Sequence, residues 1–363
     1  MDHQQRIARV RAGMAHRGID AMIFGPSSDL FYLSGIREKL SERIVCAVLT
    51  QRAFHFLLPA FELGNLSEES CSLLKVHGWT DGQDPFAMIY EMLPQGGADV
   101  ALGRHMPSWM SLPLFQRFPL NRWLLADEIM RGIRSVKSAE EYRLLKLTQE
   151  RSCRAFTRLL EQGLCGKTEL EIMRLFMELS AQEGVDSAGP LVASGPHTAL
   201  PHHTAGNRVV QPGDVLFMDF GGTERKSLYR GDTTRTVAVK RIPAQMQEIY
   251  DIVLEANHAA FRAALPGTPC SQVDKAGRSV IEKAGYGEFF THRLGHGLGL
   301  DVHEPPFLGP SSKEVLAVGN VVSNEPGIYL PGRFGIRTED ILYIREDGPE
   351  RLTPLGHELM VVD

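Results

Sequence analysis

One acidic pattern occurs twice in this sequence, within residues 213–232 and again within 319–339, and this repeat limits the fold more than any other feature. In each copy a turn glycine leads into a short apolar segment that ends in an acid. A second acid follows 13 residues later in the first copy and 14 later in the second. The four acids are Asp219 and Asp232, then Glu325 and Glu339. An apolar segment after a turn glycine is typical of a buried strand. The pattern therefore predicts two equivalent strand ends that both present carboxylates.

Four carboxylates at the ends of buried strands would repel one another, and buried charges persist when they are paired or bind metal. Two divalent cations would balance them. His296 lies between Gly295 and Gly297, in a segment that can turn tightly, and supplies an imidazole ligand. Carboxylates with one imidazole favour manganese, cobalt, iron or zinc over metals that thiolates select. Two such ions about 3.5–4 Å apart would activate a water for hydrolysis of an amide or similar C–N bond.

Helical segments repeat in the same way. Residues 166–172 and 267–273 both begin at a glycine, and each is followed by a helical pattern that reaches another glycine, Gly184 in one case and Gly285 in the other. A loop, a helix, a glycine and a strand also recur by chance in α/β proteins, so the helices alone would not establish a repeat. The matched acids favour two related α/β halves.

Residues 1–125 alternate helical and extended patterns, which predicts a separate α/β domain. Its expected strands are Ala21–Phe24, Ile44–Leu49 and Ala53–Leu58. Ser138 and Glu141 form a capping-box pattern that begins a long helix. The predicted organisation is an N-terminal domain, a linker and a C-terminal domain, at residues 1–125, 126–137 and 138–363.

Charge and cysteine content exclude several classes of protein. The 363 residues carry a formal net charge of −5, which attracts neither nucleic acid nor an anionic membrane. No apolar run approaches the ~18 residues of a membrane helix, and the start of the chain lacks the apolar core of a signal peptide. The five cysteines are scattered and odd in number, which favours reduced thiols. We therefore expect a cytoplasmic protein with no nucleic-acid or membrane partner.

Three further residues lie where they could assist hydrolysis. They are His202 in a loop rich in Gly, Pro and His, His303 downstream of His296, and Arg337 two residues before Glu339. A single loop histidine is more often solvated than functional, and Arg337 alone would be an ordinary surface residue. Near four convergent acids, the histidines become candidates for the functional site and Arg337 a candidate clamp on the carboxylates.

Taken in order, these segments resemble those of the pita-bread metallopeptidases, which include prolidase, Xaa-Pro aminopeptidase and methionine aminopeptidase. The matching segments are Asp219, Asp232-x-Thr-Arg-Thr, Gly-His296-Gly-x-Gly, Val-His303-Glu, Glu325-Pro-Gly-x-Tyr and Arg337-x-Glu339-Asp. Residues 29–35 resemble the N-terminal domain of the prolidase and creatinase branch. The resemblance covers nearly the whole chain. It implies a small creatinase-like α/β domain followed by a pita-bread domain with an internal pseudo-twofold repeat.

The resemblance also implies roles for individual residues. Asp219 and Asp232 would hold one divalent ion, and the second would be held by Asp232, His296, Glu325 and Glu339. Asp232 and Glu339 would bridge the two ions, with manganese favoured over cobalt, zinc and iron. The implied catalytic residues are Glu325 as proton acceptor, His202 and His303 as contacts to the substrate and the tetrahedral intermediate, and Arg337 as support for the carboxylates.

The implied activity is hydrolysis of Xaa-Pro bonds in small peptides by a homodimer. Two alternatives remain: a creatinase-like hydrolase or lyase acting on a small non-peptide compound, and a non-catalytic binding module that keeps the fold. The gap between Asp219 and Asp232 is longer than in many members of the family, which predicts a longer or bulged hairpin. Many dipeptidases of this kind have Arg where this chain has Phe307. Because an apolar ring cannot bind a substrate carboxylate, we expect no strong preference for dipeptides over tripeptides.

Overall fold

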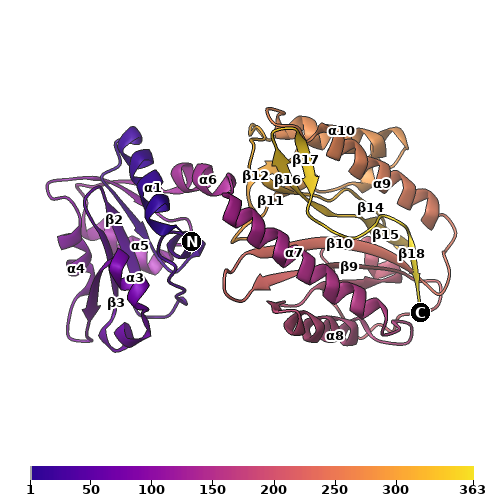
Figure 1. Ribbon diagram of the computed structural model, residues 1–363, viewed down its shortest axis with the longest axis horizontal. Coiled ribbons are helices and arrows are strands. Elements are labelled where there is room, and N and C mark those ends of the chain that lie inside the picture. Colours follow the sequence, from indigo (N-terminus) through magenta and orange to yellow (C-terminus); the bar gives the residue numbers. More distant parts are fainter. Residues whose placement is uncertain (1) are drawn as a thin grey trace. The chain divides into compact units, whose positions relative to one another are not determined.

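A computed structural model describes residues 2–363, and the chain divides into two compact units, residues 1–134 and 135–363 (Figure 1). Both units combine helices and strands, which confirms the predicted α/β class. The segment expected as a linker, residues 126–137, contains helix α6 (Asp127–Ser135). Within the described part of the chain, no helix has both the length and the apolar character needed to cross a membrane.

The N-terminal unit is built on one mixed six-stranded sheet with the strand order β4-β3-β2-β1-β5-β6. Its strands are β1 (Ala21–Phe24), β2 (Cys46–Thr50), β3 (Phe54–Pro59), β4 (Lys75–Trp79), β5 (Asp99–Leu102) and β6 (Arg122–Leu125). Its helices are α1 (His3–Arg17), α2 (Ser28–Ser34), α3 (Glu68–Leu73), α4 (Pro85–Met92) and α5 (Ser108–Arg117), with the 3-10 helix η1 (Ala60–Asn65). The three predicted strands correspond to β1, β2 and β3. The apolar runs of β1 and β2 are continuous because both faces of these strands are buried.

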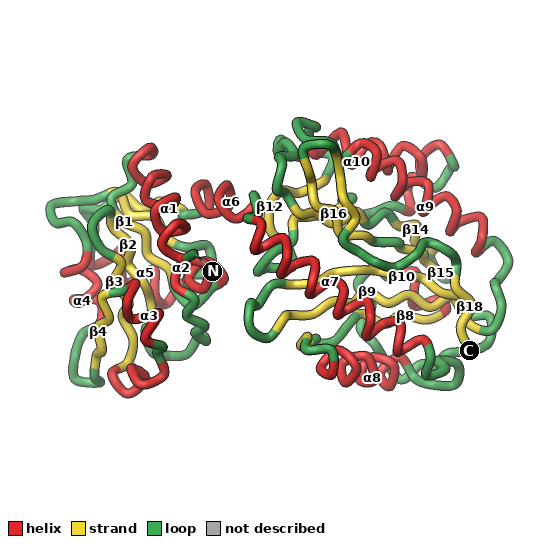
Figure 2. The backbone as a smooth tube through the Cα atoms, viewed as in Figure 1, coloured by secondary structure: helices red, strands yellow, loops and turns green. Residues whose placement is uncertain are grey.

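The C-terminal unit contains two five-stranded sheets and a two-stranded ribbon (Figure 2). The first sheet has the order β18-β10-β9-β7, with β8 also pairing with β9; the second has the order β12-β11-β13-β16-β17; and β14 pairs with β15. The strands are β7 (Val185–Asp186), β8 (Leu191–Ser194), β9 (Val215–Glu224), β10 (Arg230–Val239), β11 (Gly295–Gly297), β12 (Glu304–Leu308), β13 (Val321–Asn324), β14 (Gly327–Leu330), β15 (Phe334–Arg337), β16 (Asp340–Arg345), β17 (Gly348–Arg351) and β18 (Met360–Val362).

Two helix pairs pack against these strands. α7 (Ala139–Leu160) contacts α8 (Glu169–Gln182) and also β9 and β10, whereas α9 (Met246–Ala263) contacts α10 (Cys270–Lys283) and also β13, β14 and β15. Figure 1 shows the α9–α10 pair along one border of the unit and α8 along the opposite border, with strands between them. The predicted capping box of Ser138 and Glu141 begins α7.

Backbone angles agree with two related halves. Glycines at matched positions of the two halves have nearly equal positive φ angles: 86° and 83° at Gly166 and Gly267, 81° and 87° at Gly184 and Gly285, and 90° and 89° at Gly213 and Gly319. Residues with a side chain adopt such angles only with strain. The first and second pairs of glycines thus flank equivalent helices, α8 and α10, and the third pair precedes equivalent strands, β9 and β13. These two strands lead to the first acid of each pair, Asp219 and Glu325.

Candidate metal centre

The first pair of acids lies on the β9–β10 hairpin. The strands are antiparallel, with Asp219 opposite Thr234 and Asp232 opposite Gly221. Because residues two apart on a strand share a face, both carboxylates project from the same face and lie diagonally across the pair. The register is regular, so the wide spacing of the two acids comes from the long turn at residues 225–229 and not from a bulge.

The second pair of acids lies at one end of the other sheet. β13 and β16 are antiparallel neighbours; Glu325 directly follows β13, and Glu339 directly precedes β16. Strand β11, which pairs with β13, carries His296 at its centre. The amide of Glu339 donates a hydrogen bond to the carbonyl of Thr234 at 3.1 Å. This bond connects the end of the second sheet to β10 and brings the two pairs of acids together.

The predicted ligands converge around the His296 imidazole. His296 Nε2 lies 3.2 Å from Glu325 Oε1 and 3.6 Å from Asp232 Oδ2, and ligand atoms of Asp232, His296 and Glu339 lie within 4.8 Å of one another. Asp219 lies close enough to Asp232 for its charge to raise the pKa of that carboxyl. The same two aspartates line an open pocket of about 240 Å³, so the cluster is accessible from solvent.

The acids of this cluster carry more negative charge than the protein itself neutralises. Burial and the charge of Asp219 raise the pKa of Asp232 well above its usual range. Burial, followed by the charges of Asp232 and Glu325, does the same to the pKa of Glu339. Burial also opposes ionisation of Glu325, but its hydrogen bond to His296 lowers its pKa to about 2. Two of the four carboxyls, those of Asp232 and Glu339, therefore favour the protonated form, and a nearby cation would favour their ionisation instead.

One buried oxygen indicates that the site fits a cation. Glu339 Oε2 accepts a hydrogen bond from the Thr234 hydroxyl at 2.8 Å. Glu339 Oε1 is buried and has no hydrogen-bond partner in the described structure, whereas buried polar atoms are almost always bonded. An oxygen that lacks a donor and adjoins three other carboxyls fits a metal ligand, so the donor set suits the predicted pair of divalent ions.

Arg337 connects the centre to a neighbouring pocket through hydrogen bonds. Its side chain is buried, and Nη2 donates to Asp219 Oδ2 at 2.7 Å. Nη1 donates to Tyr329 Oη at 3.0 Å, and this hydroxyl lies 2.8 Å from His292 Nε2. Burial disfavours the charged guanidinium, but the charges around it raise its pKa. Arg337 thus remains a cation and orients Asp219. His292 and Tyr329 were not predicted as site residues; the tyrosine of the Glu-Pro-Gly-x-Tyr segment was the available signal.

His303 and His202 lie in different surroundings. The His303 ring meets the His296 ring edge to face, with centroids 4.3 Å apart. Burial and the neighbouring His296 lower the pKa of His303, so its imidazole is neutral at neutral pH and can donate or accept a proton. His202 lines an open pocket of about 540 Å³ together with His203 and His292.

Arg293 was also missed by sequence reasoning, and it bears on the substitution at Phe307. The guanidinium carbon of Arg293 lies 4.5 Å from the centroid of the Phe307 ring. Burial lowers the pKa of Arg293, and the charge of Glu325 partly reverses this effect, which places the side chain near the acid cluster. A positive charge therefore lies against the ring at the position where many dipeptidases have Arg.

Comparison with known proteins gives a consistent result over the whole chain. Residues 143–346 match the model of metallopeptidase family M24, and residues 6–136 match that of the creatinase/prolidase N-terminal domain. The chain is 36% identical to a probable dipeptidase PepE of Mycobacterium tuberculosis, over 99% of this chain and 96% of that protein. The crystal structure of dipeptidase PepE from Mycobacterium ulcerans superposes with a TM-score of 0.93 at 35% identity, covering 100% of this chain and 99% of that one. A prolidase from Thermococcus sibiricus also gives a TM-score of 0.93, at 31% identity and full coverage of both chains.

Proposed function

Since the chain belongs to metallopeptidase family M24, we propose that it is a metal-dependent exopeptidase that hydrolyses Xaa-Pro bonds in small peptides. The observation that carries this proposal is the convergence of three carboxyls on one imidazole, with the carboxyl of Asp219 close to that of Asp232. Relatives that match over nearly their full length are named dipeptidase or prolidase, which supports a short peptide as substrate.

The proposed metal ligands are the residues of the two repeated acid pairs and His296. We assign one ion to Asp219 and Asp232, and the other to Asp232, His296, Glu325 and Glu339. When bound, such a pair lowers the pKa of a water molecule and polarises the scissile carbonyl. The oxygen-rich donor set with one imidazole favours manganese, with cobalt, zinc and iron as alternatives.

Side chains of this protein account for the proton movements. Burial opposes ionisation of Glu325, but the hydrogen bond with His296 lowers its pKa enough to keep the carboxyl ionised at neutral pH. We assign Glu325, as the family resemblance implies, to take the proton that the attacking water releases and to return it to the departing proline nitrogen. We assign His303 and His202 to hydrogen bonds with the carbonyl oxygen as negative charge develops there. Arg337 acts through Asp219, whose carboxylate it orients.

Arg293 is the proposed partner of the substrate's C-terminal carboxylate. The expectation that dipeptides are not strongly preferred was based on the loss of Arg at Phe307. The contact between Arg293 and that ring retains a guanidinium in the same region, and a guanidinium can bind a carboxylate through charge-assisted hydrogen bonds. We therefore propose a preference for dipeptides that depends on Arg293, contrary to what Phe307 alone predicts.

We expect Arg293→Ala to lower kcat/KM for an Xaa-Pro dipeptide by about 10- to 100-fold, since a hydrogen bond to a charged group contributes about 1.5–3 kcal/mol. The matched substrate is the same dipeptide with a C-terminal amide, for which the loss should be small. Arg333→Ala is the control, because Arg333 is exposed. An unchanged ratio between acid and amide substrates in Arg293→Ala would assign the carboxylate contact to another residue.

The function itself is tested by a substrate panel with the metal-loaded enzyme. We expect Xaa-Pro dipeptides to exceed matched Xaa-Ala dipeptides in kcat/KM by at least about 10-fold, the discrimination that a pocket achieves for a small apolar difference. Creatine-like compounds belong in the same panel. Turnover of those compounds without peptide hydrolysis would favour the creatinase-like alternative. Metal binding without any turnover would favour the non-catalytic module.

Two broader expectations remain proposals. The five cysteines are unpaired in the structure, which is consistent with a reducing compartment and hence with the cytoplasm. The family resemblance implies a homodimer, which light scattering on the purified protein would establish. The net negative charge also supports the expectation that the protein binds neither nucleic acid nor an anionic membrane.

A further inference from the structure

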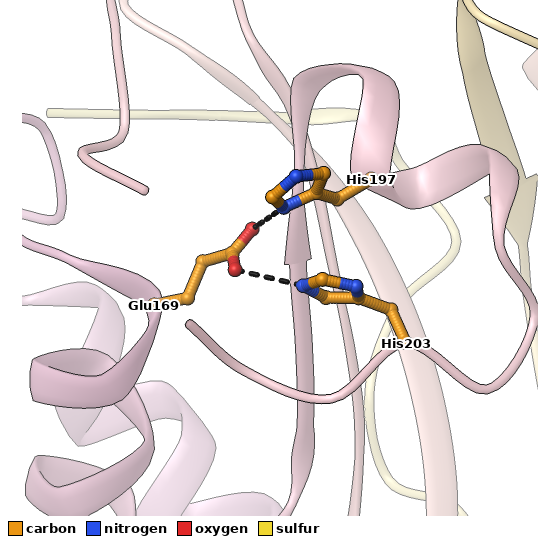
Figure 3. Close-up of side chains that lie close together, drawn as sticks. All are labelled: Glu169, His197 and His203. Atoms are coloured by element: carbon orange, nitrogen blue, oxygen red, sulfur yellow. Dashed lines mark hydrogen bonds and ion pairs between the residues drawn. The ribbon is translucent and has the colours of Figure 1, made fainter. Parts of the chain in front are cut away.

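A second cluster of side chains of the kind that bind metals lies in the C-terminal unit. Glu169 is the first residue of α8, His197 lies in the 3-10 helix η2 (Gly195–Ala199), and His203 lies in the loop that follows. Figure 3 shows the two imidazoles directed at the carboxylate, one at each oxygen. His197 Nδ1 lies 3.0 Å from Oε1, and His203 Nε2 lies 2.8 Å from Oε2. None of these three residues belongs to the set proposed for hydrolysis.

The carboxylate of Glu169 is fully buried and is oriented by groups other than the histidines. Oε1 accepts hydrogen bonds from the Ser194 amide and hydroxyl at 2.9 and 2.7 Å, and Oε2 accepts one from the Gly206 amide at 3.1 Å. Burial opposes ionisation, yet the hydrogen bonds from His203, Ser194 and Gly206 lower the pKa of Glu169. A carboxylate has about four acceptor positions. If His203 no longer donates a hydrogen bond to Oε2, the Gly206 amide is the one remaining donor to this oxygen among the residues that the structure describes. One acceptor position of Oε2 can then bind a cation.

Both histidines can exchange their hydrogen bond for a metal bond. A neutral imidazole carries its proton on either nitrogen. A shift of the proton to the other nitrogen frees His197 Nδ1 and His203 Nε2 as ligands. The three ligand atoms already lie within 4.8 Å of one another. Around a tetrahedral zinc ion with bonds of about 2.0–2.2 Å, they would lie about 3.3–3.6 Å apart. Small side-chain movements are therefore enough to complete the site.

We propose that Glu169, His197 and His203 form a third metal site, which takes one zinc ion and leaves its fourth position to water. Two imidazoles and one carboxylate are a donor set that zinc uses, with an open position, in proteins. Such a nitrogen-rich set disfavours manganese and magnesium, which prefer oxygen ligands. The His197 side chain is 38% exposed, which gives the ion a path from solvent to a carboxylate that is itself buried.

The site has a structural consequence for the proposed active site. His203 directly follows His202, and both line the same open pocket. A bound ion would link α8 to two points of the segment that carries His202. Zinc would therefore fix the position of His202 relative to the pocket, in addition to the hydrogen bonds that Ser194 and Gly206 already make with Glu169.

The test measures metal content and does not depend on hydrolysis. The carboxylate centre is first disabled by Asp232→Asn with Glu339→Gln, and the protein is titrated with Zn²⁺ by calorimetry and with Co²⁺ by visible absorption. We expect one ion per chain. Adding His197→Ala should weaken binding by at least about 10-fold, because even the loss of an outer partner of a metal ligand commonly costs 10–100-fold.

His258→Ala is the matched control, because the His258 side chain is 37% exposed and also contacts a second histidine. It should leave zinc binding unchanged. Equal zinc binding with and without His197 would overturn the proposal and leave Glu169 as a hydrogen-bonded anchor for the loop. If the disabled background does not fold, the total zinc content of wild type and His197→Ala after equilibrium dialysis decides the question. A difference of one ion per chain supports the site, and no difference overturns it.

Discussion

Glu339→Gln should abolish metal binding and peptidase activity together, while making the metal-free protein more stable. Bound metals of this kind stabilise the transition state by several kcal/mol. Their loss should therefore lower activity by at least about 10³-fold. In the metal-free protein the same substitution removes a buried carboxyl beside Asp232 and Glu325. The amide carries no charge, so it avoids both the desolvation of an ionised carboxyl and its repulsion by the neighbouring acids. Metal analysis, kinetics and thermal unfolding measure the three effects.

The gain in metal-free stability should depend on pH. Burial, and then the charges of Asp232 and Glu325, raise the pKa of Glu339 in the folded state. Below about pH 4.5, the ordinary pKa of a glutamate, the carboxyl is protonated in both the folded and the unfolded state and does not change the stability. As the pH rises from there, the unfolded chain ionises first and the folded wild type loses stability. The advantage of Glu339→Gln should therefore grow from about pH 4.5 towards neutrality.

Glu346→Gln is the control, because it makes the same chemical change at an exposed position in the turn that follows β16. It should retain metal, activity and the wild-type pH dependence of unfolding. Added Mn²⁺ should raise the melting temperature of wild type and of this control, because a ligand that binds the folded state stabilises it by mass action. A Glu339→Gln protein that keeps two ions per chain would show that Glu339 does not bridge them.

The acids of the centre could be predicted because a local pattern specifies the first acid of each pair, and a nearly equal spacing identifies the second. A glycine with positive φ, an apolar run and an acid after it are written in consecutive residues, and the fold repeats them. The prediction that both acids stand at strand ends holds for Glu325, which follows β13, but is wrong for Asp219, because β9 continues past it to Glu224. One adjacent residue shows where this reasoning fails. Two adjacent acids are seldom both buried, since charged residues mostly lie at the surface, yet Glu339 and Asp340 are both buried. Asp340 pairs with Arg235 at 2.8 Å and with His357 at 2.7 Å. Burial opposes its ionisation, but these partners lower its pKa to about 2.

The remaining features depend on contacts between residues that are distant in the sequence. Arg337 reaches Asp219 across 118 positions, so no spacing rule could specify that pair. Arg293 reaches Phe307 only because β11 and β12 pair as antiparallel neighbours. Glu169 was not predicted as a metal ligand for another reason. It begins a helix after Thr168, where acids are common because they interact favourably with the helix dipole. Its second role depends on a loop whose path the sequence does not reveal.

The other large effect is expected for His303→Ala, which should reduce turnover by about 10²–10⁴-fold, the usual contribution of a group that transfers a proton or stabilises developing charge. The metal content should not change. The reason for this separation is geometric: His303 packs edge to face against the ring of His296 and is not among the residues whose ligand atoms converge. Burial and the proximity of His296 lower its pKa, so at neutral pH the imidazole is available to donate a hydrogen bond to the substrate oxygen.

Two comparisons distinguish this role from a structural one. His303→Gln restores a hydrogen-bond donor of similar size without an imidazole, so it should recover part of kcat if the residue stabilises developing charge, and little if it must transfer a proton. His258→Ala, a change at a half-buried histidine on α9, should leave both kcat and metal content near wild-type values. If His303→Ala loses metal to the same extent as Glu339→Gln, the packing of its ring against His296 holds that ligand in place. His303 would then support the centre instead of acting on the substrate.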